Sequence, residues 1–79
     1  MILIIFASPI SAFDMQVVNQ EGIIIDKCSS TYENARYALD KLVQKHKIEE
    51  AMVFGPQAFT LKIIQELQQY YDFPISGQM

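Results

Sequence analysis

The chain has 79 residues, of which 51% are apolar and 19% charged, and its formal net charge is −3. This length allows one small domain with a thin stability margin, and the apolar fraction argues against disorder. A mildly acidic chain without a basic patch lacks the surface by which nucleic-acid-binding proteins hold phosphates. We therefore predict a single domain over residues 1–79 and expect no nucleic-acid partner.

The cellular compartment is inferred from the cysteine content and from the first residues. Cys28 is the only cysteine, so no internal disulfide forms, which is typical of a cytoplasmic protein. We expect Cys28 to be a packed or half-exposed thiol rather than a reactive one. The apolar run at residues 1–7 follows no Lys or Arg, is short for a signal peptide and is far shorter than the ~20 residues that span a bilayer. We expect a cytoplasmic protein without membrane contact.

Three strands are predicted in the first third of the chain. Ile2 to Ala7 is apolar at every position, which is typical of a central strand covered on both faces, and Pro9 ends it. Phe13 to Val18 alternates apolar and polar residues, as in a strand with one exposed face. Asn19 to Gly22 has the residues of a turn, and Ile23 to Ile25 is the returning strand. These strands form an antiparallel meander.

A helix is predicted to begin at Ser30. Ser30 and Glu33 fit a capping box, and the apolar residues of 32–43 recur at three- and four-residue spacing. Basic residues at 45–47 complement the carbonyl groups at the helix C-terminus. We interpret His46 as an exposed partner of the helix dipole rather than a metal ligand or catalytic base.

A second strand-to-helix unit completes the chain. Ala51 to Phe54 is a short apolar strand, and Pro56 suits a first helical position. A crossover of strand, helix and strand makes this strand parallel to the third. The helix ends at Asp72 to Pro74, after which Ile75 can add a fifth strand. The predicted fold is a mixed α/β (α+β) sheet of the form βββαβα, with strand order 3-2-1-4, or 3-2-1-4-5, and helices packed on the sheet.

This order of elements is similar to the ribonuclease-H-like fold of small resolvase-like and rRNA-processing proteins. Residues 54–57, Phe-Gly-Pro-Gln, resemble the turn that ends the fourth strand in that family. The resemblance covers most of the chain at the level of topology and implies a degenerate, truncated member. Its nucleases hold metal ions with an Asp in the first strand and a second acid after the fourth. Here those positions are Ala7 or Ser8 and Phe54 or Gly55, so we expect no metal site, no cofactor and no nuclease activity.

One candidate binding site lies at the carboxyl ends of the strands. In open parallel sheets ligands bind beyond these ends, and free amides at two helix N-termini there favour an anion such as phosphate. An alternative is that the same side chains only cap helices and turns. The candidate ligand-binding residues are Ser8, Ser11, Ser30, Gly55 and Gln57.

A candidate interface is indicated by aromatic residues outside the apolar stripes of the helices. Exposed aromatic side chains are enriched where proteins contact one another, although partial burial explains them equally well. The candidate interface residues are Tyr37, Tyr70, Tyr71 and Phe73.

These observations favour a non-enzymatic binding or interaction module that self-associates, because an apolar edge strand invites pairing with a second copy. A specific version is a compact inhibitor or ligand-sequestering protein of the kind that bacteriophages encode. One alternative is a minimal ribonuclease-H-like nuclease or nucleic-acid-binding protein that holds metal ions between chains. Another is a module that binds a phosphorylated small molecule at the carboxyl ends of the strands.

Overall fold

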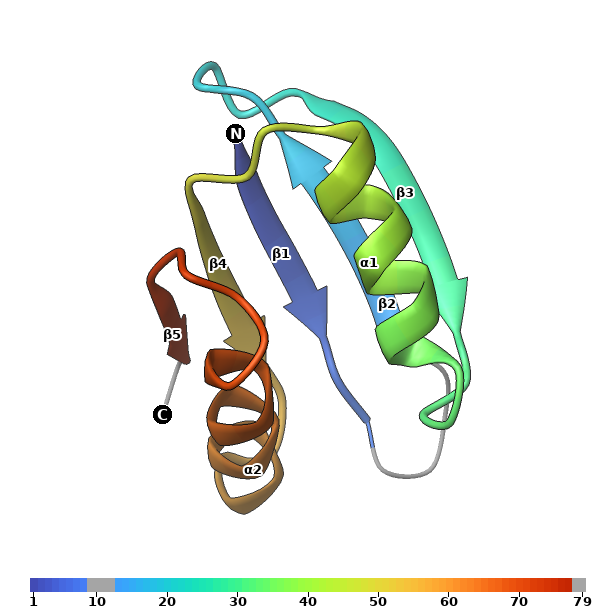
Figure 1. Cartoon of the computed structure of the whole chain (residues 1–79), viewed down its shortest axis with the longest axis vertical. Helices are drawn as coiled ribbons and strands as arrows, with labels where there is room; N and C mark the ends of the chain where they lie inside the picture. The colour runs from blue at the N-terminus through green and yellow to red at the C-terminus, as the bar shows by residue number, and fades with distance from the viewer. Residues whose placement is uncertain (9–12, 78–79) are drawn as a thin grey trace.

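The computed structural model describes residues 1–8 and 13–77, and within these ranges it contains one mixed sheet and two helices (Figure 1). The strand order is β3-β2-β1-β4-β5, which confirms the predicted order, including the short fifth strand. In chain order the elements are β1 (Ile2–Phe6), β2 (Phe13–Val18), β3 (Ile24–Ser30), α1 (Ala35–Lys45), β4 (Glu50–Phe54), α2 (Gln57–Gln68) and β5 (Ile75–Gly77).

The central strand β1 joins an antiparallel half of the sheet to a parallel half. β2 runs antiparallel to both β1 and β3, whereas β4 runs parallel to β1 and to β5. Leu3 in β1 lies opposite Val17 in β2 and Ala51 in β4, and all three are buried. Because side chains alternate between the faces of a sheet, this register fixes which residues of each strand meet the helices.

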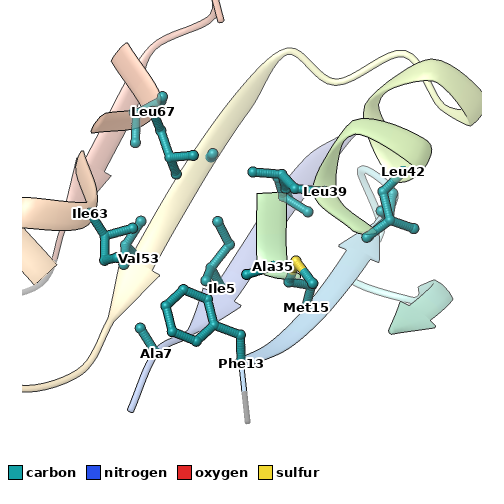
Figure 2. Close-up of a cluster of buried hydrophobic side chains, with 14 residues drawn as sticks. Ile5, Ala7, Phe13, Met15, Ala35, Leu39, Leu42, Val53, Ile63 and Leu67 are labelled. Atoms are coloured by element: carbon teal, nitrogen blue, oxygen red, sulfur yellow. The ribbon is translucent and has the colours of Figure 1, made fainter. Parts of the chain in front are cut away.

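The core lies between the sheet and the two helices. Every second residue of the strands points to this side, and the apolar stripes of α1 and α2 close over them. Figure 2 shows Leu39 and Ala35 of α1 on one side of Ile5, and Ile63 and Leu67 of α2 on the other. The buried apolar residues of the core are Leu3, Ile5, Ala7, Phe13, Met15, Val17, Ala35, Leu39, Leu42, Ala51, Val53, Ile63, Leu67 and Ile75.

Both helices pack on the same face of the sheet, so the prediction that β1 is covered on both faces is wrong. α1 contacts β2 and β3, and α2 contacts β4 and β5, from one side (Figure 1). The connections from β3 to β4 and from β4 to β5 cross the sheet in the same direction. Right-handed crossovers that move in one direction place their helices on one face. In the described ranges the opposite face has no helix, and we call it the open face.

The third strand is longer than predicted, and α1 begins later. β3 pairs with β2 as far as Ser30, which lies opposite Phe13, so the predicted helix start and the capping box of Ser30 with Glu33 are wrong. α1 begins at Ala35, and its N-cap residue Asn34 makes no side-chain capping hydrogen bond. Residues 26–30 are mostly polar, so they did not give the apolar pattern by which a strand is predicted. An edge strand does not need such a pattern.

Candidate functional site

The predicted ligand-binding residues lie at one edge of the sheet, but the structure divides them. β1 and β4 end side by side, where the Ala7 amide donates to the Phe54 carbonyl at 2.8 Å. A Cβ at Gly55 would lie 2.5 Å from the carbonyl oxygen of Ala7, so the close approach of the two strands requires glycine there. Ser8 is half-buried and Gln57 exposed beside this junction.

Ser30 lies away from that junction, at the end of the edge strand β3. Two strands separate β3 from β4, which places their ends roughly 14 Å apart at the usual strand spacing. Three aromatic rings contact one another between the helix N-termini: Phe13 lies 5.5 Å from Tyr32 and 5.9 Å from Phe59, measured between centroids. Ser11, the fifth candidate, lies outside the described residues.

Two of the four predicted interface residues are exposed. Tyr37 is 66% exposed on α1, with the Lys41 ammonium group 4.4 Å from its ring centroid. Tyr70 follows α2 and is 49% exposed, and the Arg36 guanidinium group lies 3.2 Å from its ring centroid. Both rings therefore lie against cations on the helix side of the molecule, as cation–π pairs do.

The other two, Tyr71 and Phe73, are half-buried and stack on each other at 5.3 Å between centroids. The Tyr71 hydroxyl donates a hydrogen bond to Asp40 of α1. Burial, and then the negative charge and hydrogen bond of Asp40, raise the pKa of Tyr71 above its ordinary value. These two rings connect the segment after α2 to the core and to α1.

The open face carries a continuous apolar strip that the sequence prediction missed. Phe6 of β1 is 43% exposed and stacks on Phe54 of β4 at 5.5 Å between centroids, and Met52 is 36% exposed. Strand pairing places these side chains beside half-buried apolar neighbours from β1, and the strip continues to the start of β3. We call this set the apolar band: Ile2, Ile4, Phe6, Ile24, Met52 and Phe54, which are exposed or half-buried, and Val18, which is buried between Ile2 and Ile24.

Polar residues flank the apolar band on both sides. One flank, on β2 and β3, carries Lys27 and Asp14, and the Ser29 hydroxyl donates a hydrogen bond to Asp14. The other flank, on β4 and β5, carries Glu50 and Ser76. An apolar centre with a polar rim is the usual composition of a protein interface.

His46 is not the exposed residue that the sequence predicted. Its Nε2 lies 2.8 Å from Oδ2 of Asp26, and its side chain is only 15% exposed. Lys45 Nζ lies 3.4 Å from the same oxygen. The hydrogen bond from His46, with smaller contributions from the Lys27 amide and then from Lys45, holds the pKa of Asp26 below its ordinary value. The pattern missed this pair because β3 extends far enough to place Asp26 on the side of α1.

In the ranges that the structure covers, no three His, Cys, Asp or Glu side chains gather where they could hold a metal ion. Among those same residues, no helix combines the length and apolarity needed to cross a membrane. Comparison of the chain with protein-family models, with characterised proteins and with solved structures finds no match. The resemblance to the ribonuclease-H-like family, the single domain, the cytoplasmic location, the nuclease alternative and the phosphorylated ligand stay predictions.

Proposed function

We propose that this protein is a non-enzymatic interaction module that self-associates, with two copies packed through the apolar band of the open face. The observation that carries the proposal is the exposure of Phe6 and Met52 beside Phe54, on a face that has no helix in the described ranges. Contiguous exposed apolar surface of this kind marks sites of protein contact. The covering of a face by a second sheet is a standard packing, with about 10 Å between the sheets.

The size of the open face supports a broad, flat partner. The molecule measures 29 × 22 × 21 Å. Its broad face therefore has a plan area of about 600 Å², and a stable interface buries ~800 Å² per partner. The plan area is smaller than this requirement, so a partner must cover the whole face and also contact the sides of the side chains that project from it. The open face of a second copy has the same extent and the same apolar centre.

The charges on the two flanks favour a second copy over an unrelated apolar partner. A two-fold axis along the apolar band places each band on the other, because the same patch serves both copies. This operation sets the flank with Lys27 above the flank with Glu50, so opposite charges face each other. Asp14, on the same flank as Lys27, already accepts a hydrogen bond from Ser29.

The edge strand β3 offers a second route to self-association. Its outer edge is unpaired in the sheet, and Ile23, Ile24 and Ile25 at its start are 55%, 45% and 39% exposed. An unpaired apolar edge can add a strand from another copy. β3 is also rich in polar residues from Asp26 onward, which limits the length of an apolar contact along the edge. We therefore assign the principal contact to the open face.

The proposal is tested by size-exclusion chromatography with light scattering across a range of protein concentrations. We expect a dimer for the unchanged protein and a monomer for Phe6→Lys, because the substitution places a charge in the centre of the apolar band. Leu61→Lys is the matched control: Leu61 is 42% exposed, nearly as much as Phe6, but lies on α2. It should leave the dimer intact.

A third variant distinguishes self-association through the open face from self-association through the edge strand β3. Ile23→Lys adds a charge at the start of the β3 edge, where Ile23 precedes the residues paired with β2 and is 55% exposed, and it should also leave the dimer intact. A strictly monomeric unchanged protein at high concentration would refute self-association. Loss of the dimer in Ile23→Lys but not in Phe6→Lys would move the interface to the edge strand. Circular dichroism of each variant checks that the fold is retained.

A further inference from the structure

The apolar band crosses the open face diagonally rather than along one strand. It begins with Ile24 on β3, in the same row of paired residues as Ile2 at the start of β1. It ends with Phe54 on β4, in the same row as Phe6 at the end of β1. Between these ends the band crosses three strand spacings, about 14 Å, and advances about 13 Å along the strands. The band therefore lies at about 45° to the strand direction.

Charges of opposite sign lie on the two flanks of the apolar band. Lys27 lies on the flank of β2 and β3, and Glu50 lies on the flank of β4 and β5. Both side chains are exposed, and none of the ion pairs in the described ranges includes either of them. Asp14, on the flank of Lys27, accepts a hydrogen bond from Ser29. The open face therefore offers a cation and an anion for ion pairs with a partner.

The direction of the two-fold axis between two copies decides which of these charges meet. An axis parallel to β1 would place Lys27 over β5 of the partner, and an axis perpendicular to the strands would place it over the partner's Lys27. An axis along the apolar band exchanges the two flanks, so Lys27 comes over the partner's Glu50. At the usual strand spacing the two positions lie within about 6 Å of each other in projection, and the side chains span the ~10 Å between packed sheets.

We infer that the two copies pack with their strands nearly perpendicular, about a two-fold axis along the apolar band, and that two reciprocal Lys27–Glu50 ion pairs fix this orientation. The inference rests on the proposed self-association through the open face. Because the band lies at about 45° to the strands, the operation turns the partner's strands by about 90°, which is the orthogonal class of sheet packing. The apolar band supplies the contact area, and the charged flanks disfavour the other orientations, because electrostatic complementarity fixes the register of an interface.

Charge reversal followed by mixing tests this orientation, with the dissociation constant of the dimer measured by light scattering over a range of protein concentrations. Lys27→Glu and Glu50→Lys should each weaken the dimer at least about tenfold, because two attractions per dimer become repulsions. An equimolar mixture of the two variants should form a heterodimer about as tight as the unchanged dimer. In that heterodimer opposite charges again face each other at both positions.

Two control variants change the net charge by the same amounts on the other side of the sheet. Lys62→Glu and Glu66→Lys lie at exposed positions of α2, and each should dimerise as the unchanged protein does. A third variant, Asp14→Asn, removes the anion beside Lys27 and should change the dissociation constant less than about threefold, because Asp14 is already hydrogen-bonded to Ser29. Circular dichroism shows whether each variant is folded.

Failure of the orientation and failure of self-association give different results. A monomeric unchanged protein refutes both. A dimer that Phe6→Lys abolishes, but that Lys27→Glu and Glu50→Lys leave intact, would keep the open face as the interface and overturn the orientation. Two weakened variants whose mixture stays monomeric would also overturn it, because Lys27 and Glu50 would then not face each other. A tighter dimer in Asp14→Asn would place Asp14 rather than Lys27 over the partner's Glu50, with the same consequence.

Discussion

The two faces of the sheet are built from the same strands but differ in what covers them. On β1, Leu3 and Ile5 are 0% and 1% exposed beneath the helices, whereas Phe6, on the open face, is 43% exposed. All of these residues are apolar, so composition alone does not distinguish a covered face from an open one. The direction in which the helical connections cross the sheet decides it. The covered face stabilises the fold, and the open face carries the surface through which we propose that two copies associate.

The difference between the two faces is tested most directly by truncating two neighbouring residues of β1 whose side chains point to opposite faces. Leu3→Ala should cost about 2–5 kcal/mol, because it leaves a cavity in the core. In a chain of this length such a loss unfolds a large fraction of the protein. Ile4→Ala, one residue further on, should cost no more than about 1 kcal/mol in the monomer and weaken the dimer instead. Urea unfolding and light scattering measure the two effects.

Equal destabilisation by the two substitutions at low protein concentration would show that the open face is covered within the monomer. The comparison of faces, and with it the dimer proposal, would then fail.

The junction of β1 and β4 tests whether the two halves of the sheet are held as closely as the structure shows. Gly55→Ala should destabilise by roughly 1–3 kcal/mol, because the new Cβ meets the Ala7 carbonyl oxygen and the backbone must move. Ala58→Ser, exposed in the first turn of α2, is a control that should change stability little. Thermal unfolding of both variants gives the measurement. An unchanged melting temperature for Gly55→Ala would contradict the close approach.

The fold was largely predictable because strong apolar patterns stood at the centre of the sheet. The alternation of Phe13, Met15 and Val17 fixed the covered side of β2, and the spacing of residues 50–60 indicated a strand followed by a helix. The course of β3 was harder to predict, since Asp26 to Ser30 form a polar edge strand whose pairing is set by β2. The residue types at Ser30 and Glu33 favoured a helix start there. In the structure, Ser30 instead pairs with Phe13 as the last residue of β3.

The candidate sites were less predictable than the fold. Free helix N-termini indicated a binding site at the strand ends, but Ser30 belongs to the edge strand β3 rather than to a helix N-terminus, and two strands separate it from Gly55 and Gln57. Predicting the apolar band would have required knowing that both helices lie on one face of the sheet.

A smaller effect is expected where Tyr71 connects the covered side to α1. Tyr71→Phe should destabilise by about 0.5–1.5 kcal/mol, because it removes the hydrogen bond to Asp40. Tyr37→Phe, on an exposed ring, is the matched control and should change little. Because folding raises the pKa of Tyr71, its stabilising contribution is full below the ordinary value near 10 and is lost as the pH rises above it.

The alkaline part of this prediction is measured by unfolding experiments across that range. The unchanged protein should lose stability more steeply with rising pH than Tyr71→Phe does. Parallel profiles for the two proteins would show that the Tyr71 hydroxyl does not respond to folding.

The smallest effect on stability is expected when Asp26, at the margin of the covered side, is substituted. Its pKa is lowered in the folded protein, chiefly by the hydrogen bond from His46, so it contributes stability above the ordinary value of 3.8. This contribution is lost as the pH falls through the folded pKa. Asp26→Asn should therefore show a flatter acid profile of the melting temperature between roughly pH 2 and 5. His46→Gln keeps the carboxylate but removes its main partner, and it should flatten the profile too. A His46→Gln profile as steep as that of the unchanged protein would assign the acid sensitivity to other carboxylates, and the contact between β3 and the end of α1 would then contribute only packing.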